Sequence, residues 1–179
     1  MLQDIREVLI SKEAIEAKTK ELAERISRDY KGKDLLAVGV LKGSVIFASE
    51  LIKNITIPCE IDFMAVSSYG SSSETTGVVR ILKDLDSEIS GKHILIVEDI
   101  VDSGVTLSYL LNYLKTRNAS SVEIASLLTK PSRRKVDIDC KYIGFETPDE
   151  FLVGYGLDYA EKYRNLPFIG ILKREVYEK

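Results

Sequence analysis

The most informative part of this sequence is the run Ile94-Leu95-Ile96-Val97-Glu98-Asp99-Ile100-Val101-Asp102-Ser103-Gly104-Val105-Thr106. It starts within an apolar segment, residues 93–97, which is typical of a strand buried on both faces of a sheet. Carboxylates, hydroxyls and a glycine follow, and the pattern then predicts a helix over residues 106–117. A buried strand joined by a short polar loop to a helix is the unit from which parallel sheets are built.

Similar units lie on both sides of this run. Ser11 is a good N-cap for a helix that ends near Tyr30, and residues 34–40 predict a second buried strand before a helix over residues 45–53. Further strands are expected at residues 60–69, 78–83, 122–128, 140–145 and 168–172. The alternation predicts an α/β fold, a doubly wound, mostly parallel twisted sheet flanked by helices, in one domain spanning residues 1–179.

Two neighbouring segments depart from this alternation. Residues 60–69 place Ile61, Phe63 and Ala65 opposite Asp62 and Met64, which predicts a half-exposed strand. Residues 67–77 are mostly Ser, Thr and Gly, and residues 78–83 can pair back as the second arm of a hairpin. We interpret residues 67–77 as either a flexible hairpin tip or a lid over a site.

The composition excludes several classes of function. With 25 Lys and Arg against 28 Asp and Glu, the net charge is −3, which argues against binding to nucleic acid or to an anionic membrane surface. One histidine, His93, and two cysteines, Cys59 and Cys140, are too few for a zinc cluster with four ligands. The sequence has neither a signal peptide nor an apolar run near the roughly 18 residues of a membrane span. We therefore expect a cytoplasmic protein.

The second half of the opening run has the parts of a phosphate site. Gly104 allows close approach of the backbone, Ser103 and Thr106 supply hydroxyl donors, and a helix that begins there offers free N–H groups. The first half is unusual for such a site, because Glu98, Asp99 and Asp102 would repel a bare phosphate. Sugar hydroxyls, Mg²⁺ or a base nitrogen that loses a proton would suit these carboxylates, so a phosphorylated sugar satisfies both halves.

Two simpler interpretations remain open at this point. Asp102-Ser103 alone can be a helix cap without any ligand. Paired acids at the end of a strand also hold Mg²⁺ in phosphoacceptor receiver domains, but a receiver would begin at this strand, and only the chain from Ile94 onward is available for it.

The run resembles the phosphoribosyl-pyrophosphate motif of the type I phosphoribosyltransferases, in which an apolar strand, two acids and two apolar residues precede Asp-Ser-Gly-x-Thr. The similarity to the hypoxanthine-guanine phosphoribosyltransferases extends over nearly the whole chain. It includes Leu41-Lys42-Gly43, Ser68-Tyr69, Lys130, residues 145–159 and Arg164. The resemblance adds a small hood formed by the chain termini and a hairpin lid to the expected fold.

The resemblance implies a Mg²⁺-dependent enzyme of purine salvage. Ribose 5-phosphate passes from phosphoribosyl pyrophosphate to a 6-oxopurine, hypoxanthine or guanine, to give the nucleoside monophosphate and pyrophosphate. It also implies a homodimer or homotetramer. The alternatives are a transferase for xanthine, and a regulator of the same fold that senses phosphoribosyl pyrophosphate and binds nucleic acid.

The resemblance also assigns residues to the sugar phosphate and the leaving group. The backbone and hydroxyls of Ser103, Gly104, Val105 and Thr106, in a loop over residues 97–106, would hold the 5-phosphate. Glu98 and Asp99 would lie near the ribose hydroxyls and their Mg²⁺, and Asp158 would be a further Mg²⁺ ligand. The residues expected to contact pyrophosphate are Lys42, Gly43, Ser68, Tyr69 and Arg164, and the Leu41–Lys42 peptide is often cis in the family.

For the base, the resemblance implies stacking on Phe151, donation from Lys130 to the 6-oxygen, and reading of the 2-position by the Leu152 backbone. An ammonium has only donors, so Lys130 would reject the 6-amino group of adenine. Asp102 is the expected general base, because His93 lies at the opposite end of its strand. The charges at residues 133–135 are interpreted as a solvated turn.

Overall fold

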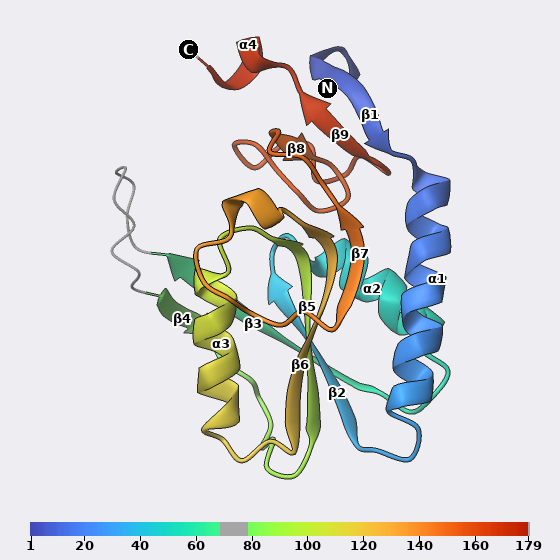
Figure 1. Cartoon of the computed structure of the whole chain (residues 1–179), viewed down its shortest axis with the longest axis vertical. Coiled ribbons are helices and arrows are strands. Elements are labelled where there is room, and N and C mark those ends of the chain that lie inside the picture. Colours follow the sequence, from blue (N-terminus) through green and yellow to red (C-terminus); the bar gives the residue numbers. More distant parts are fainter. Residues whose placement is uncertain (69–78, 179) are drawn as a thin grey trace.

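Two β-sheets organise the chain in the computed structural model, which describes residues 1–68 and 79–178 (Figure 1). Within these residues the larger sheet has six strands in the order β4-β3-β2-β5-β6-β7, and all neighbours are parallel except β3 and β4. Its strands are β2 (Leu35–Leu41), β3 (Glu60–Ser68), β4 (Val79–Lys83), β5 (His93–Val101), β6 (Ser121–Thr129) and β7 (Tyr142–Glu146). The mostly parallel sheet predicted from the sequence is confirmed.

Helices cover both faces of this sheet, as a doubly wound fold requires. Successive side chains of a strand point to opposite faces, so Leu35 and Ala37 of β2 join one apolar cluster while Leu36 and Val38 join another. The first cluster lies under α1 and α2, and the second lies under α3 on the other face (Figure 1). The helices are α1 (Lys12–Asp29), α2 (Val45–Asn54) and α3 (Val105–Lys115).

The order of the strands reverses between β2 and β5. The chain leaves β2 through α2 to β3 on one side, and leaves β5 through α3 to β6 on the other. β2 and β5 are themselves parallel neighbours, with Gly39 opposite Val97, so the segments that follow both strands emerge side by side. In open α/β sheets such a reversal opens a crevice beyond the carboxyl ends of the strands, where ligands bind.

A second sheet forms the expected hood from the two ends of the chain. Its order is β1-β9-β8, both pairs are antiparallel, and Figure 1 shows it beyond the carboxyl ends of the main strands. The remaining elements are β1 (Ile5–Ile10), β8 (Leu152–Val153), β9 (Ile169–Leu172), α4 (Arg174–Tyr177), and the 3₁₀ turns η1 (Leu2–Asp4) and η2 (Pro131–Arg133). The strand predicted at residues 168–172 therefore belongs to the hood, and β1 and β8 were not predicted.

The structure corrects the start of the predicted loop over residues 97–106. β5 continues to Val101, so Glu98 and Asp99 lie on the strand rather than in the loop. The reason is pairing with β6, which continues through Glu98 opposite Ser126 to Val101 opposite Thr129. Only the short connection between β5 and α3 remains as loop.

Strand β3 is half-exposed, as predicted. Met64 is completely buried, whereas the side chain of Ile61 on the opposite face is 55% exposed. Most of the predicted lid, residues 67–77, lies outside the described residues, and its role stays a prediction. No helix in the described ranges is both long enough and apolar enough to cross a bilayer.

The buried face of α2 gives a test of the packing. Phe47 is fully enclosed between the helix and the sheet, so Phe47→Ala should lower the free energy of unfolding by about 3–5 kcal/mol in urea titrations. Ile61→Ala, on the exposed face of β3, should stay within about 0.5 kcal/mol of the wild type. Equal losses in the two variants would contradict this assignment of the core.

Candidate active site

Two cavities adjoin at the carboxyl ends of the central strands. The smaller, about 180 Å³, is lined by the end of β5 and the start of α3. The larger, about 430 Å³, lies between β5, the segment after β6, and the hood. Ile100 and Asp102 line both cavities, so the two spaces meet at these residues.

The smaller cavity has the geometry expected of a phosphate cradle. It is lined by Glu98, Asp99, Ile100, Asp102, Ser103, Gly104, Thr106 and Leu107. Gly104 has φ +83°, and a Cβ atom there would lie 3.0 Å from the carbonyl oxygen of Val136. The Val105 N–H points back to Ser103 Oγ at 3.4 Å, which places the start of α3 directly at the cavity.

Two buried carboxylates border this cavity. Burial raises the pKa of Asp99 to about 6; the charge of Asp158 adds to the increase and that of Arg164 opposes it. Burial, together with the charge of Asp99, also raises the pKa of Glu98 well above its ordinary value. Asp99 Oδ1 accepts a hydrogen bond from the Ile100 N–H at 2.7 Å. A bound cation or a group of hydroxyl donors would therefore stabilise the charged form of these carboxylates.

The turn after β2 lies directly against Asp99. The Leu41–Lys42 peptide is cis, and a Cβ atom on Gly43 would collide with Asp99 Oδ2. Gly156, with φ +104°, approaches from the hood side, where a Cβ atom would collide with the carbonyl oxygen of Gly43. Both positions require glycine because backbone and carboxylate meet without space for a side chain.

Lys42 and Arg164, the cationic residues expected to bind pyrophosphate, both form ion pairs with the same carboxylate. Glu161 Oε2 is 3.2 Å from Lys42 Nζ and 3.3 Å from an Arg164 nitrogen. Hydrogen bonds from Lys42 and Arg164 lower the pKa of Glu161. Arg164 also lies 3.0 Å from Asp158 Oδ1 and donates to the carbonyl oxygen of Gly156 at 2.7 Å.

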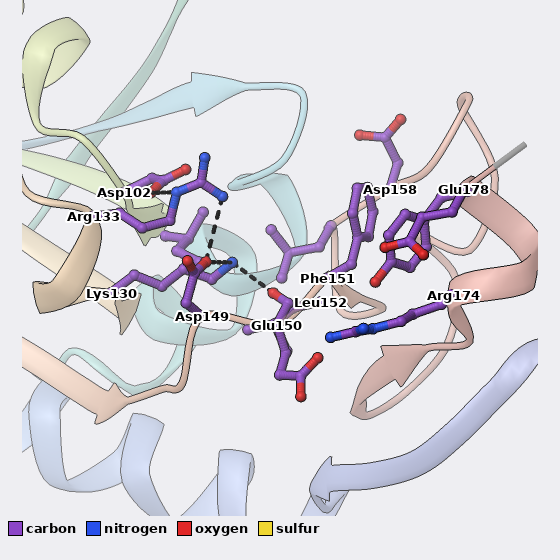
Figure 2. A pocket seen from close by; sticks show the side chains of 13 residues that line it. Asp102, Lys130, Arg133, Asp149, Glu150, Phe151, Leu152, Asp158, Arg174 and Glu178 are labelled. Carbon is purple, nitrogen blue, oxygen red and sulfur yellow. Dashed lines mark hydrogen bonds and ion pairs between the residues drawn. The ribbon is translucent and has the colours of Figure 1, made fainter.

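The larger cavity combines an enclosed ammonium with an aromatic ring (Figure 2). Lys130 is only 6% exposed, and its Nζ donates to the carbonyl oxygen of Glu150 at 2.6 Å. Burial lowers the pKa of Lys130, with the charge of Asp102 opposing the shift. The ring of Phe151 stacks on Tyr177 with centroids 4.7 Å apart and meets the edge of another tyrosine.

The turn at residues 133–135 is largely solvated, as interpreted, since Arg133 and Lys135 are exposed, but it also contacts the site. Arg133 Nε lies 3.1 Å from Asp102 Oδ1 at the wall of the larger cavity. Arg134 donates to Thr129 Oγ1 at 2.7 Å, and the Lys135 N–H donates to the carbonyl oxygen of Ser103 at 2.9 Å. The 3₁₀ turn η2 folds this segment back onto the loop after β5, which composition alone does not indicate.

Most of the residues predicted from the sequence come together here. Ser68 ends β3, but its side chain and all of Tyr69 lie outside the described structure. His93 lies at the far end of β5, where its Nδ1 is 2.8 Å from Ser121 Oγ, in agreement with a structural role. Other residues at the site were not predicted from the sequence: Ile100, Arg133, Asp149, Glu161, Arg174 and Tyr177.

Known proteins with a similar sequence and a similar fold identify the family. The phosphoribosyl transferase domain matches residues 8–160. The hypoxanthine-guanine phosphoribosyltransferase of Bacillus subtilis (strain 168) is 55% identical over 178 residues, which covers 99% of both chains. The chain belongs to the hypoxanthine-guanine phosphoribosyltransferases. A relative of the same description from Staphylococcus aureus (strain Mu50 / ATCC 700699) is 54% identical over 99% of both chains.

Solved structures agree with this family. The crystal structure of a hypoxanthine phosphoribosyltransferase from Staphylococcus aureus matches with a TM-score of 0.97 and 53% identity, over 100% of this chain and 97% of that one. As a hypoxanthine-guanine phosphoribosyltransferase, the chain is an enzyme of purine salvage that transfers a ribose 5-phosphate group to a purine base. The activity predicted from the sequence is confirmed.

The carboxylates fit the magnesium ion that the family implies. Among the described residues, no group of three or more His, Cys, Asp or Glu side chains forms a ready metal cage. Magnesium is usually held by one or two carboxylates together with waters and substrate phosphates, so a full cage is not required. Glu98, Asp99 and Asp158 offer such carboxylates at the two cavities.

The raised pKa of Asp99 predicts a pH-dependent cost to folding. A carboxyl whose pKa is higher in the folded state favours folding when protonated, so the free energy of unfolding falls as pH rises from about 4 to about 6. In urea titrations without Mg²⁺, Asp99→Asn should raise the free energy of unfolding at pH 7.5 by on the order of 1–3 kcal/mol, with little change at pH 4.

Asp139→Asn provides the matched control, because Asp139 is exposed and lines neither cavity. It should leave the pH dependence of unfolding as in the wild type. The same dependence in Asp99→Asn as in the control would contradict the cost assigned to Asp99.

Proposed function

We propose that the two cavities together hold phosphoribosyl pyrophosphate and a 6-oxopurine, and that Asp102 takes the proton of the base. The observation that carries this proposal is that Asp102 lines both cavities. A carboxylate at their junction lies where the sugar of one substrate meets the ring nitrogen of the other. The neighbouring side chain there, Ile100, is apolar and helps to exclude water.

The smaller cavity suits the ribose 5-phosphate. Ser103 and Thr106 supply hydroxyls, Gly104 lets the backbone approach closely, and the Val105 N–H, which donates to Ser103 Oγ here, lies at the positive end of the α3 dipole. Glu98 borders the same space, where ribose hydroxyls can donate to its buried carboxylate.

Pyrophosphate would lie against Lys42, Gly43 and Arg164, with Ser68 and Tyr69 added from the predicted lid. Backbone N–H groups at the turn after β2 and the planar guanidinium of Arg164 suit phosphate oxygens. Magnesium bound by Glu98, Asp99 or Asp158 and by substrate oxygens would supply further positive charge against the leaving group.

The larger cavity suits a 6-oxopurine. One donor of the Lys130 ammonium is held by the carbonyl oxygen of Glu150, which leaves two donors for the 6-oxygen of the base. Adenine would leave these buried donors facing an amino group, which is a strong basis for its rejection. Phe151 offers its ring for stacking, and the Leu152 backbone would read the 2-position.

The proposed reaction couples bond formation at the ribose to proton transfer. As pyrophosphate leaves, positive charge develops on the ribose, the base nitrogen bonds to the anomeric carbon, and its proton passes to Asp102. Hypoxanthine and guanine are the bases we expect. A dimer or tetramer and a cytoplasmic location also stay predictions.

Asp102→Asn tests the proton transfer. The amide cannot accept the proton, so kcat for pyrophosphate release with Mg²⁺, phosphoribosyl pyrophosphate and hypoxanthine should fall about 10²- to 10⁴-fold. Asp139→Asn serves again as the control and should keep wild-type turnover. Unchanged kcat in Asp102→Asn would remove Asp102 as the base. No release by the wild type with hypoxanthine, guanine or xanthine would refute the proposed reaction.

Substitution of Glu161 gives a second test, because its carboxylate pairs with Lys42 and Arg164, the cations proposed to bind pyrophosphate. Glu161→Gln should lower KM for phosphoribosyl pyrophosphate roughly two- to fivefold, since an exposed ion pair that opposes binding is removed. Glu21→Gln, which breaks an ion pair with Lys18 on α1, should leave this KM unchanged. An increase in KM for Glu161→Gln would show instead that Glu161 assists binding.

A further inference from the structure

The two oxygens of Asp102 have different surroundings. Oδ1 is enclosed by protein and lies 3.1 Å from Arg133 Nε, although it makes no well-aligned hydrogen bond with any of the described residues. The side chain as a whole is nevertheless 42% exposed. Because Oδ1 contributes almost nothing to this exposure, Oδ2 is the oxygen that is free to face the cavities.

The segment around Arg133 forms backbone hydrogen bonds with the residues on both sides of Asp102. On one side, the Lys130 N–H donates to the carbonyl oxygen of Val101 at 2.9 Å. On the other side, the carbonyl oxygen of Ser103 accepts hydrogen bonds from the N–H groups of residues 135 and 136 at 2.9 and 3.2 Å. These hydrogen bonds hold the backbone of the turn beside the backbone of Asp102, so the two side chains start from neighbouring positions.

The guanidinium of Arg133 is also held from its other side. Its NH1 lies 3.5 Å from Asp149 Oδ1, so the group bridges two carboxylates, as the dashed lines in Figure 2 show. Asp149 in turn lies 3.9 Å from Lys130 Nζ. A guanidinium is planar and stays protonated in proteins, so it can orient a carboxylate without exchanging a proton with it.

We propose that Arg133 is a positioning residue for Asp102, an inference that rests on the proposed role of Asp102 as the base. Arg133 holds Oδ1 against the protein and thereby directs Oδ2 to the junction of the cavities. The base N–H bond breaks there and an O–H bond forms on Oδ2, while the nitrogen bonds to the anomeric carbon and pyrophosphate departs. Arg133 itself acts on the reaction through Asp102.

A double-mutant cycle tests this role. Arg133→Met should lower kcat about tenfold, because misplacement of a catalytic group by a fraction of an ångström is costly, and should change KM for hypoxanthine less than twofold. In the Asp102→Asn background, Arg133→Met should cause no further loss, since there is no base left to position. Arg133→Lys should keep more turnover than Arg133→Met, because an ammonium can still pair with Oδ1.

Arg117→Met is the matched control. Arg117 lies 3.1 Å from Asp84, the same separation as in the Arg133 pair, but away from both cavities. It should leave kcat unchanged. Urea titrations of all variants should show that Arg133→Met unfolds no more readily than this control, which separates positioning from a loss of folded protein.

The opposite outcomes are distinct. Additive losses in the double variant would overturn the inference and place Arg133 in direct contact with a substrate. An effect confined to KM, or no effect of Arg133→Met, would overturn it as well, while leaving Asp102 as the base. Full turnover in Asp102→Asn alone would refute the proposed role of Asp102, and the inference about Arg133 would fall with it.

Discussion

The site depends on the close approach of three backbone segments at Gly43. The turn after β2 lies against the Asp99 carboxylate of β5, and Gly156 from the hood side packs on the carbonyl oxygen of Gly43. No side chain fits at either glycine, so the turn, the strand and the hood are held in a single arrangement. That arrangement brings Lys42 and Arg164 onto the same carboxylate, Glu161, and encloses the carboxylate of Asp99. Packing of the whole chain thus sets the electrostatics of the site.

The local sequence pattern was sufficient to predict the strands at the centre of the fold but not strands β1 and β8 of the hood. Residues 35–40 and 94–97 are apolar throughout, because parallel strands are buried on both faces, and this signal is unambiguous. The hood lacked such a signal, since β1 and β8 acquire their strand conformation by pairing with β9. The carboxylates of Glu98 and Asp99 were assigned to a loop, yet pairing with β6 keeps them in the strand. Tertiary pairing overrode local preference in both cases.

Some residues of the candidate site could likewise be predicted from the sequence, and others could not. The grouping of residues 98–106 around one cavity could be predicted, because the residue types that suit a sugar phosphate are contiguous in the sequence. Arg133 could not, because a basic turn after proline is usually solvated, and only the fold of η2 onto the β5 loop brings it to Asp102. Tyr177 reaches Phe151 only through the hood. The geometry of Ser68 and Tyr69 lies outside the described residues, so their contribution stays a prediction.

The hood also has a consequence for the order of folding. Ile10 of β1 pairs with Ile169 of β9, so β1 must wait until nearly all of the intervening chain has been synthesised. Contacts between residues so distant in sequence form late, because closing a long loop costs conformational entropy. The main sheet and the phosphate cradle can therefore assemble before the wall of the larger cavity exists. A growing chain would acquire a place for the sugar phosphate before it acquires a place for the base.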